Sequence, residues 1–448
     1  MNLKNYFLIM IVFTVVPIKT TYKNKMLIKY VKVSTNENKI QFKVLKVERR
    51  WYMGENIYFK REVFEIRDFS EIKNNKEDIL EFLNELIFYS LKENVSDIHI
   101  ESKEIDIKIR VRIDGILKYY QDLNKNFGLK LMTKLKLMSE LDIGEKRLPQ
   151  DGRFKGRYKN EKIDFRVSLV PTIFGERCVL RILKNNISEV SLENLGFTNE
   201  NLIKLKELLN RKNGLLLFCG PTGSGKTTTL YSIVNYLNNE KLNIITIEDP
   251  IEYQFPNINQ IQCKNEIGLD FSKILRSVLR QDPDIILVGE IRDKETAEIA
   301  LMASLTGHLV ITTLHTKDAI SAIDRLINFG VDKFIIATAI NAIESQRLVR
   351  KVCKICGGKT ENSCCNEGFK GREVVEEIIF FDKEIRDIIL NKSIKDLENY
   401  LKLKGFKTLL DNGFIKVETR ITTKSEVLKE CLIWNYIDVL FLIKKEIR

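Results

Sequence analysis

The spacing of apolar positions changes along the chain, and each spacing predicts a different kind of element. Over residues 76–94 the apolar positions recur every three or four residues, which predicts an amphipathic helix. Apolar and polar residues alternate over 105–113, which predicts a strand with one buried face, and residues 97–101 predict a strand before it. Asp114-Gly115 is expected to form the turn that closes this pair.

The same part of the chain contains further elements. A second helix is expected over 129–140, and strands are expected over 163–169 and 177–183. Together they predict an α+β domain of about one hundred residues, which we place at 73–185. Residues 186–200 are expected to link it to the next domain.

Uninterrupted apolar runs replace the alternating pattern in the second half of the chain. They occur at 214–219, 242–247, 285–289 and 309–314. Such runs are typical of parallel strands that are buried on both faces. The sequence therefore predicts an α/β domain over 201–350, built around a parallel sheet.

The loop after the first run has the spacing of a phosphate-binding P-loop, Gly220-x-x-x-x-Gly225-Lys226-Thr227, and a helix-compatible run follows it. Its glycines let backbone N–H groups turn toward a phosphate at a helix N-terminus. Lys226 is expected to reach the β- and γ-phosphates, and the Thr227 hydroxyl to ligate Mg²⁺. The residues expected to hold the nucleotide are Gly220, Pro221, Thr222, Gly223, Ser224, Gly225, Lys226, Thr227 and Thr228.

Polar side chains follow the other predicted core strands. Glu248, Asp249 and Glu252 come at or after the second, and Glu290 follows the third in the position of a Walker B carboxylate. Ligands bind at the carboxyl ends of strands in an open α/β sheet, so these groups should face the nucleotide. Of the chain's three histidines, His315 ends the fourth strand on that edge, whereas His308 precedes the strand and should lie at the far end.

Composition and charge narrow the class of protein. The 448 residues suffice for two or three domains, and 44% hydrophobic with 30% charged residues exclude a disordered or fibrous chain. The net charge of +12 would suit nucleic acid or an acidic membrane surface. Its lysines are scattered without a compact basic block, so a solvated lysine-rich surface is the favoured interpretation.

Arginines concentrate in the α+β domain, although the chain otherwise prefers lysine. Arginine suits bidentate contacts with phosphate or carboxylate, and the alternative is that these are outward strand positions paired with nearby acids. The residues are Arg110, Arg112, Arg147, Arg153, Arg166, Arg177 and Arg181.

The two ends of the chain leave alternatives open. The apolar stretch 6–18 resembles the core of a signal peptide, is short for a bilayer span and lacks an Ala-x-Ala site. Three alternatives remain for this stretch. It is a strand or helix of a small N-terminal region over 1–72, a weak membrane contact, or sequence from a wrongly assigned start upstream of Met26. Short alternating runs predict a few strands between 26 and 69. The apolar tail 431–443 predicts either a packed terminal helix or an amphipathic docking helix.

Several motifs in order resemble one family. Ser96-Asp-Ile-His-Ile-Glu101, Arg110-Val-Arg-Ile-Asp-Gly115 and Arg147-Leu-Pro-Gln-Asp-Gly152 match its N-terminal landmarks. The P-loop is its Walker A, and residues 247–252, 280–293 and 306–316 resemble its Asp box, Walker B segment and His box. Gly371-Arg372, 405–409 and 413–417 continue the match. Residues 93–428 thus resemble the hexameric secretion ATPases that drive type II secretion and type IV pilus assembly.

The resemblance implies a fold and a set of partners. It implies a RecA-like P-loop ATPase core, preceded by an α+β (PAS-like) domain and followed by a cysteine motif at 351–372 and a helical C-terminal subdomain at 373–448. ATP and Mg²⁺ would be used by a homo-oligomer, in this family a hexamer. The chain would lie in the cytoplasm, held peripherally at the inner face of the membrane by a platform protein. Eight cysteines, most of them not spaced for pairing, also favour a reducing cytosol.

Site roles follow from the resemblance residue by residue. Glu248 would orient or deprotonate the attacking water, with Asp249 and Glu252 in support. Glu290 would hold the Mg²⁺–water network, and His315 would sense the γ-phosphate. Arg166 and Arg177 of the preceding domain would complete the pocket, and that domain would move as a rigid unit during turnover.

The cysteine motif departs from the family pattern. Family members that extend pili or secrete proteins carry two Cys-x-x-Cys pairs, taken to bind zinc. Here Cys353 and Cys356 form one pair, only residues 357–363 follow, and Cys364 and Cys365 are adjacent because Asn362 stands where a cysteine is expected. The two alternatives are a tetrahedral zinc site and a reduced, metal-free remnant.

The expected function is an ATP-hydrolysing motor for pilus assembly or type II secretion. A pilus-retraction ATPase shares the core, but such relatives lack the cysteine pair. A RecA-type DNA translocase would suit the positive charge, yet the sequence contains no recognisable nucleic-acid module, so nucleic acid is an unexpected partner. A non-enzymatic nucleotide-binding scaffold would lack the catalytic carboxylates, which are present.

Overall fold

The computed structural model describes residues 26–36, 39–49, 64–66, 78–159, 161–184, 191–359 and 364–432, the first two ranges as backbone only. The alternatives for residues 6–18, and for the tail beyond 432, therefore lie outside the described residues. The chain forms two units, Met1–Glu62 and Val63–Arg448. In the first, β1 (Met26–Asn36) and β2 (Lys39–Arg49) pair as an antiparallel hairpin, which confirms strands in this region.

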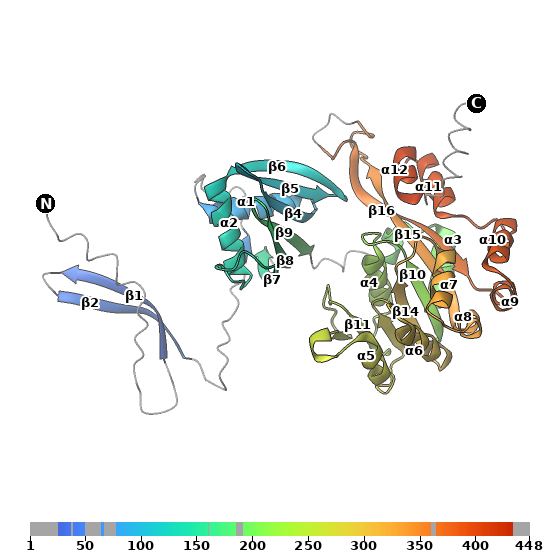
Figure 1. Ribbon diagram of the computed structural model, residues 1–448. Helices are drawn as coiled ribbons and strands as arrows, with labels where there is room; N and C mark the ends of the chain where they lie inside the picture. The colour runs from blue at the N-terminus through green and yellow to red at the C-terminus, as the bar shows by residue number, and fades with distance from the viewer. Residues whose placement is uncertain are drawn as a thin grey trace. The chain divides into compact units, whose positions relative to one another are not determined.

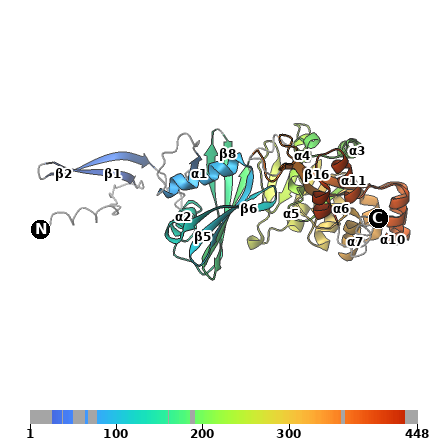
Figure 2. The same ribbon diagram turned by 90° about the horizontal axis from the view of Figure 1, so that it is seen from above.

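The second unit begins with a seven-stranded sheet in the order β3-β7-β8-β9-β4-β5-β6. Its strands are β3 (Phe64–Ile66), β4 (Val95–Ser102), β5 (Asp106–Ile113), β6 (Ile116–Asn124), β7 (Gln150–Tyr158), β8 (Glu161–Thr172) and β9 (Gly175–Lys184). Two helices, α1 (Ile79–Lys92) and α2 (Lys125–Met138), pack against it (Figure 2). The alternating residues of β5 put one apolar set into this core, as the spacing predicted.

The Asp114-Gly115 turn was assigned wrongly. It joins β5 to β6, not β4 to β5. The strands β6 and β7 were not expected, because β6 is a partly exposed edge strand and β7 is rich in charged residues and glycine. The side chains of β6 do not alternate, and the less exposed positions of β7 include Gly152 and Gly156, so neither strand alternates apolar with polar residues in the sequence.

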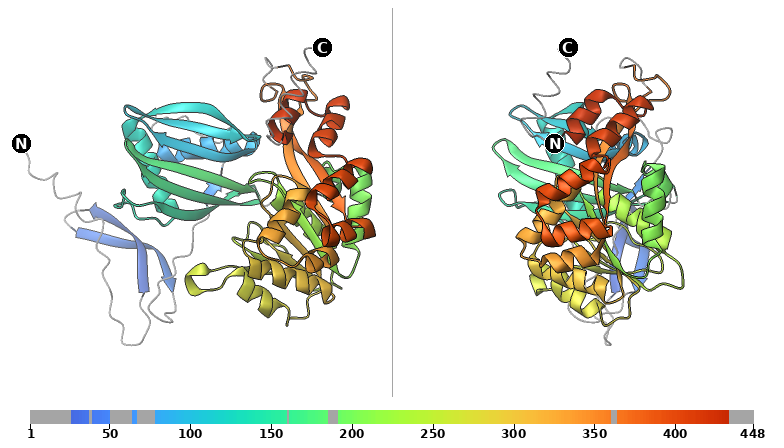
Figure 3. Two further views of the ribbon diagram at one scale, coloured as in Figure 1. Left: turned by 45° about the vertical axis from the view of Figure 1, so that its right-hand side comes forward. Right: turned by 90° about the vertical axis from the view of Figure 1, so that its right-hand side faces the viewer.

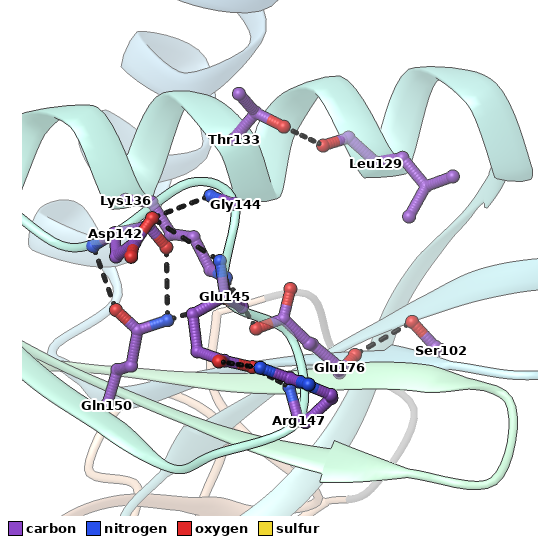
Figure 4. Close-up of polar contacts among 10 residues, drawn as sticks. All are labelled: Ser102, Leu129, Thr133, Lys136, Asp142, Gly144, Glu145, Arg147, Gln150 and Glu176. Carbon is purple, nitrogen blue, oxygen red and sulfur yellow. Dashed lines mark hydrogen bonds and ion pairs between the residues drawn. The ribbon is translucent and has the colours of Figure 1, made fainter.

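The loop between α2 and β7 carries Arg147 and is fixed by a buried lysine (Figure 4). Lys136 is 2% exposed, pairs with Glu176 at 2.6 Å and donates to the Glu145 carbonyl at 2.6 Å. From the other side the Gln150 amide donates to the Asp142 and Glu145 carbonyls at 3.1 and 2.9 Å. Lys136 and Gln150 thus donate hydrogen bonds to the loop carbonyls. The Arg147 side chain stays 87% exposed.

The second sheet has the order β12-β11-β13-β14-β10-β15-β16. Its strands are β10 (Gly214–Cys219), β11 (Ile244–Glu248), β12 (Asn259–Gln262), β13 (Ile285–Val288), β14 (Leu309–Leu314), β15 (Ile340–Val352) and β16 (Phe369–Phe380). All neighbours are parallel except β15 and β16, which pair antiparallel. The four apolar runs are confirmed as β10, β11, β13 and β14.

Helices cover both faces of this sheet (Figure 1). One face packs against α3 (Asn199–Leu209) and α4 (Lys226–Leu237). The other packs against α5 (Phe271–Val278), α6 (Lys294–Leu305), α7 (Ala319–Asn328) and α8 (Lys333–Ala339). The expected α/β core is confirmed, and the carboxyl ends of its parallel strands share one edge.

The C-terminal part is helical, but it begins later than expected. β16 occupies residues 369–380, where a helical subdomain was placed from 373, and the cysteine motif is the connection of the β15–β16 hairpin. Glu376 and Glu377 are buried, so the sequence of this strand resembles that of a polar, exposed segment. Four helices follow, with α11 against β16 and α12 against β15 (Figure 3): α9 (Lys383–Asn391), α10 (Ile394–Leu403), α11 (Leu409–Glu418) and α12 (Lys424–Cys431).

The Lys136–Glu176 pair gives a first prediction. Lys136→Met leaves the Glu176 carboxylate buried without its partner, so it should cost about 3–5 kcal/mol of stability. Thermal unfolding of the full chain measures this. Lys130→Met, at an exposed position of the same helix, is the control. A midpoint equal to that of the control would contradict a structural role for the pair.

Candidate nucleotide site

The P-loop connects β10 to α4 and has the backbone that its glycines allow. Gly220, Gly223 and Gly225 have φ values of 146°, 83° and 93°, which a side chain would strain. Gly225 precedes Lys226, the first residue of α4, so the helix N-terminus opens directly onto the loop. This arrangement concentrates unpaired N–H groups where an anion would bind.

Lys226 lies folded over the loop. Its side chain is 8% exposed, and Nζ donates to the carbonyls of Gly220 at 2.7 Å and Pro221 at 3.0 Å. Burial lowers the pKa of Lys226. The two carbonyls hold the Lys226 ammonium at the mouth of the loop. From there it can move to the phosphate oxygens of a nucleotide.

A cavity of about 850 Å³ opens in front of the P-loop. Eight of the nine predicted nucleotide-binding residues line it, from Pro221 to Thr228, and Gly220 contributes its carbonyl to Lys226 instead. Glu248, Asp249, Glu252, Glu290 and His315 also line it. The structure thus brings the predicted carboxylates and the histidine to the same edge as the loop.

Glu248 ends β11 and is held by three donors. It is 5% exposed and accepts hydrogen bonds from the Thr246 hydroxyl at 2.6 Å, the Gln260 amide at 3.0 Å and the Tyr231 hydroxyl. Burial, together with the Glu248 carboxylate, raises the pKa of Tyr231, so this phenol stays a donor. The sequence did not indicate these partners, because Tyr231 has the spacing of a core residue of α4 and β12, which carries Gln260, was not predicted.

Glu290 follows β13 and contacts two side chains, His315 and Arg292. His315 Nε2 lies 3.0 Å from its Oε2, and the Arg292 guanidinium pairs with its other oxygen. Arg292 also reaches Asp249 at 3.2 Å, so it connects the Walker B carboxylate to the Asp box. Arg292 belongs to the segment 280–293, but the sequence did not indicate these contacts. His308 lies at the other end of β14, as expected, with Nδ1 2.9 Å from the Ala303 carbonyl.

The arginines of the preceding domain form a row across its sheet. Register places Arg153 opposite Arg166, Arg166 opposite Arg181, and Asp97 between Arg181 and Arg112. Like charges on facing strand positions are destabilising unless an anion compensates them. In this row Asp97 pairs with Arg181 at 2.8 Å, and Glu252 of the α/β core pairs with Arg166 at 2.9 Å.

The two arginines chosen from the sequence differ in position. Arg166 bonds Glu252 and the Ile251 carbonyl, next to the Asp box. Arg177 instead contacts His99 at 3.3 Å and Glu101 at 3.4 Å. Neither is among the described residues that line the cavity. The arginines that do line it are Arg112, Arg181, Arg347, Arg350 and Arg372.

The sequence signal for these arginines was incomplete. Arg112 and Arg181 belonged to the noted arginine group but were not selected from it. Arg347, Arg350 and Arg372 come from β15 and β16, which were not predicted as strands of this sheet. Their position next to the P-loop follows only from the pairing of β10 with β15.

The four cysteines of the motif converge. The sulfurs of Cys353, Cys356, Cys364 and Cys365 all lie within 4.8 Å of one another. Cys353 lies 3.9 Å from Cys364, and Cys356 lies 3.3 Å from Cys365. Tetrahedral zinc with Zn–S bonds of about 2.3 Å separates its sulfurs by about 3.8 Å. The donor set therefore fits a zinc ion, despite the adjacent pair.

Fold and site together define a P-loop ATPase with a RecA-like core. Residues 73–429 match the family model described as Type II/IV secretion system protein, and the chain belongs to this family. It is therefore an ATP-hydrolysing, Mg²⁺-dependent enzyme of the secretion ATPase class. Among the residues that the structure describes, no helix combines the length and the apolar character needed to cross a membrane.

Relatives and solved structures agree with this assignment. Type II secretion system protein HxcR of Pseudomonas aeruginosa is 42% identical over 360 residues, covering 78% of this chain and 77% of the relative. Type IV pilus assembly ATPase PilB of Thermus thermophilus is 42% identical over 375 residues, covering 78% of this chain and 42% of that longer protein. The crystal structure of the pilus retraction motor PilT with bound ADP shares 30% identity and a TM-score of 0.56, and covers 77% of this chain and 95% of PilT.

Lys226→Ala is the first test of the site. Removing the ammonium from the loop should abolish nucleotide binding and turnover together. Isothermal titration with MgADP and a phosphate-release assay measure the two effects. Lys212→Ala, at an exposed position before β10, is the control. Tight MgADP binding by Lys226→Ala would contradict the assignment of the loop.

Glu248→Gln separates binding from hydrolysis. The amide cannot act as a base, so hydrolysis should fall by about two orders of magnitude or more while MgATP binding stays near that of the wild type. Single-turnover hydrolysis and equilibrium binding measure the split. Glu290→Gln is the matched comparison. If Glu290→Gln shows this split and Glu248→Gln stays active, the two roles are exchanged.

Proposed function

We propose that this ATPase is the cytoplasmic motor of a machine that assembles a type IV pilus or drives type II secretion through a pseudopilus. The observation that carries the proposal is the shared edge of P-loop, Glu248, Glu290 and His315, faced by arginines of the preceding domain. HxcR and PilB, which are named for these two processes, match the chain over both domains.

The residues of the edge have distinct roles in this proposal. Backbone N–H groups of the P-loop and Lys226 bind the phosphates. Thr227 and Glu290 would hold Mg²⁺, which would supply positive charge to the phosphate oxygens. Glu248 orients the attacking water and takes its proton, while Tyr231, Thr246 and Gln260 fix the carboxylate. His315, whose Nε2 lies 3.0 Å from Glu290, would sense the γ-phosphate.

In this proposal the arginine row couples ATP hydrolysis to movement of the domain over 73–185. Arg112 and Arg181 face the P-loop cavity, and Arg166 holds Glu252 of the Asp box. The attraction between this row and the core depends on the charge of the bound phosphates, so loss of the γ-phosphate weakens it. The domain over 73–185 would then move against the core, and a homo-hexamer would transmit this movement to a platform protein at the inner face of the membrane. Arg177 lies outside this row and contacts His99 and Glu101 of the same sheet.

Zinc belongs to the same proposal. Cys353, Cys356, Cys364 and Cys365 would hold one Zn²⁺ as thiolates and close the connection of the β15–β16 hairpin. The cysteine pair favours assembly or secretion over retraction. PilT, a retraction motor, shares the core fold, so the core does not distinguish the two directions.

The function is tested in the cell that encodes the chain. Deleting the gene should abolish surface pili or the secreted proteins, and plasmid-borne wild type should restore them. Glu248→Gln should fail to restore them although the protein accumulates normally. A deletion strain that still assembles pili and can no longer retract them would instead identify a retraction motor.

The metal content tests the zinc site. Purified wild-type protein should contain about one zinc per chain by plasma mass spectrometry, and Cys364→Ser should contain much less. Cys263→Ser, outside the cluster, is the control and should keep its zinc. A wild-type zinc content near zero, after purification without chelators, would show that the cluster is a metal-free remnant.

A further inference from the structure

Gln346 lies directly behind the P-loop, and the sequence patterns did not indicate a role for it. It sits on β15 and is fully buried. Its amide nitrogen donates to the Ser224 carbonyl at 2.6 Å, and its amide oxygen accepts from the Thr229 hydroxyl at 2.8 Å. One side chain therefore contacts both the loop and the first turn of α4.

The bond to Ser224 sets the direction of a peptide group. In a planar trans peptide the carbonyl of Ser224 and the N–H of Gly225 point in opposite directions. When Gln346 holds the carbonyl toward β15, it turns the Gly225 N–H toward the side where the phosphate binds. The same bond satisfies a carbonyl that would otherwise be buried without a partner.

The loop packs on Gln346 closely. A Cβ on Gly225 would come within 3.0 Å of the Gln346 amide nitrogen, and one on Gly220 within 2.8 Å of its backbone oxygen. Thr229 N–H donates to the Gly225 carbonyl at 3.0 Å. Through the Thr229 hydroxyl, the Gln346 amide is therefore also hydrogen-bonded to the first turn of α4. Sequence gives no sign of this contact, because 117 or more residues separate Gln346 from its partners.

We propose that Gln346 is a positioning residue for nucleotide binding, which holds the Ser224–Gly225 peptide in the orientation that the phosphate requires. It acts through the backbone of the P-loop and does not touch the nucleotide. The N–H groups of the loop contact phosphate before and during the reaction alike. Loss of Gln346 should therefore weaken binding of substrate and product equally and leave the chemical step largely intact.

The inference rests on nucleotide binding at the P-loop and is independent of which fibre the motor moves. The test uses full-length Gln346→Met, which keeps the length of the side chain and removes both hydrogen bonds. MgADP affinity by titration, and KM and kcat by phosphate release, are measured with the thermal midpoint of the nucleotide-free protein. Gln281→Met, at an exposed position, is the matched control.

The expected result is a Kd for MgADP and a KM for ATP that both rise about tenfold, with kcat changed by less than about threefold. Thr229→Val should weaken MgADP binding in the same direction, and Thr229→Ser, which keeps the hydroxyl, should restore it. These two variants keep the test valid if Gln346→Met does not fold. The proposal is overturned if Gln346→Met binds MgADP within twofold of the wild-type affinity. If only Thr229→Val folds, the same criterion applies to that variant. A loss of kcat with KM unchanged also overturns the proposal. If the wild type itself binds no MgADP, the nucleotide site fails first, whatever Gln346 does.

Discussion

The structure depends on a common edge of one parallel sheet, where a P-loop must keep its N–H groups directed at an anion. This constraint explains the buried strands β10, β11, β13 and β14, whose carboxyl ends deliver the loop, Glu248, Glu290 and His315 to one cavity. It also explains why three donors hold Glu248, since a buried carboxylate without hydrogen bonds is costly in free energy.

The β15–β16 hairpin connects this edge of the sheet to the cysteine cluster and to the C-terminal helices. Gln346 braces the P-loop, Arg347 and Arg350 line the cavity, and the strand then enters the cysteine cluster. On β16, Glu377 accepts the N–H of Ala319 at 2.8 Å and of Leu409 at 2.9 Å, so one carboxylate caps α7 and α11. Burial raises the pKa of Glu377 to about 7. The nucleotide site, the cluster and the C-terminal helices therefore all contact the β15–β16 hairpin.

The sequence was sufficient where the chemistry is local. The P-loop, the carboxylates at strand ends and His315 follow from short motifs and from the direction of parallel strands, and the four core strands follow from apolar runs. Strands with other patterns were missed: β6 is an exposed edge, β7 is charged, and β16 contains buried glutamates. Contacts between distant segments were also missed, since the partners of Glu248 and the position of Arg347 follow from strand pairing. Arg166 and Arg177 were expected at the pocket, whereas Arg112 and Arg181 line the cavity, and local spacing does not distinguish these arginines.

A structure of the protein with Mg²⁺ and a non-hydrolysable ATP analogue tests the central claim most directly. The account predicts that Lys226 leaves the Gly220 and Pro221 carbonyls for the phosphates. It also predicts that the Glu248 carboxylate lies within hydrogen-bond reach of the water in line with the γ-phosphate, and that Glu290 lies on the Mg²⁺ side. If Glu248 stays bound to Tyr231, Thr246 and Gln260 alone while Glu290 contacts that water, the assignment of the catalytic edge is wrong.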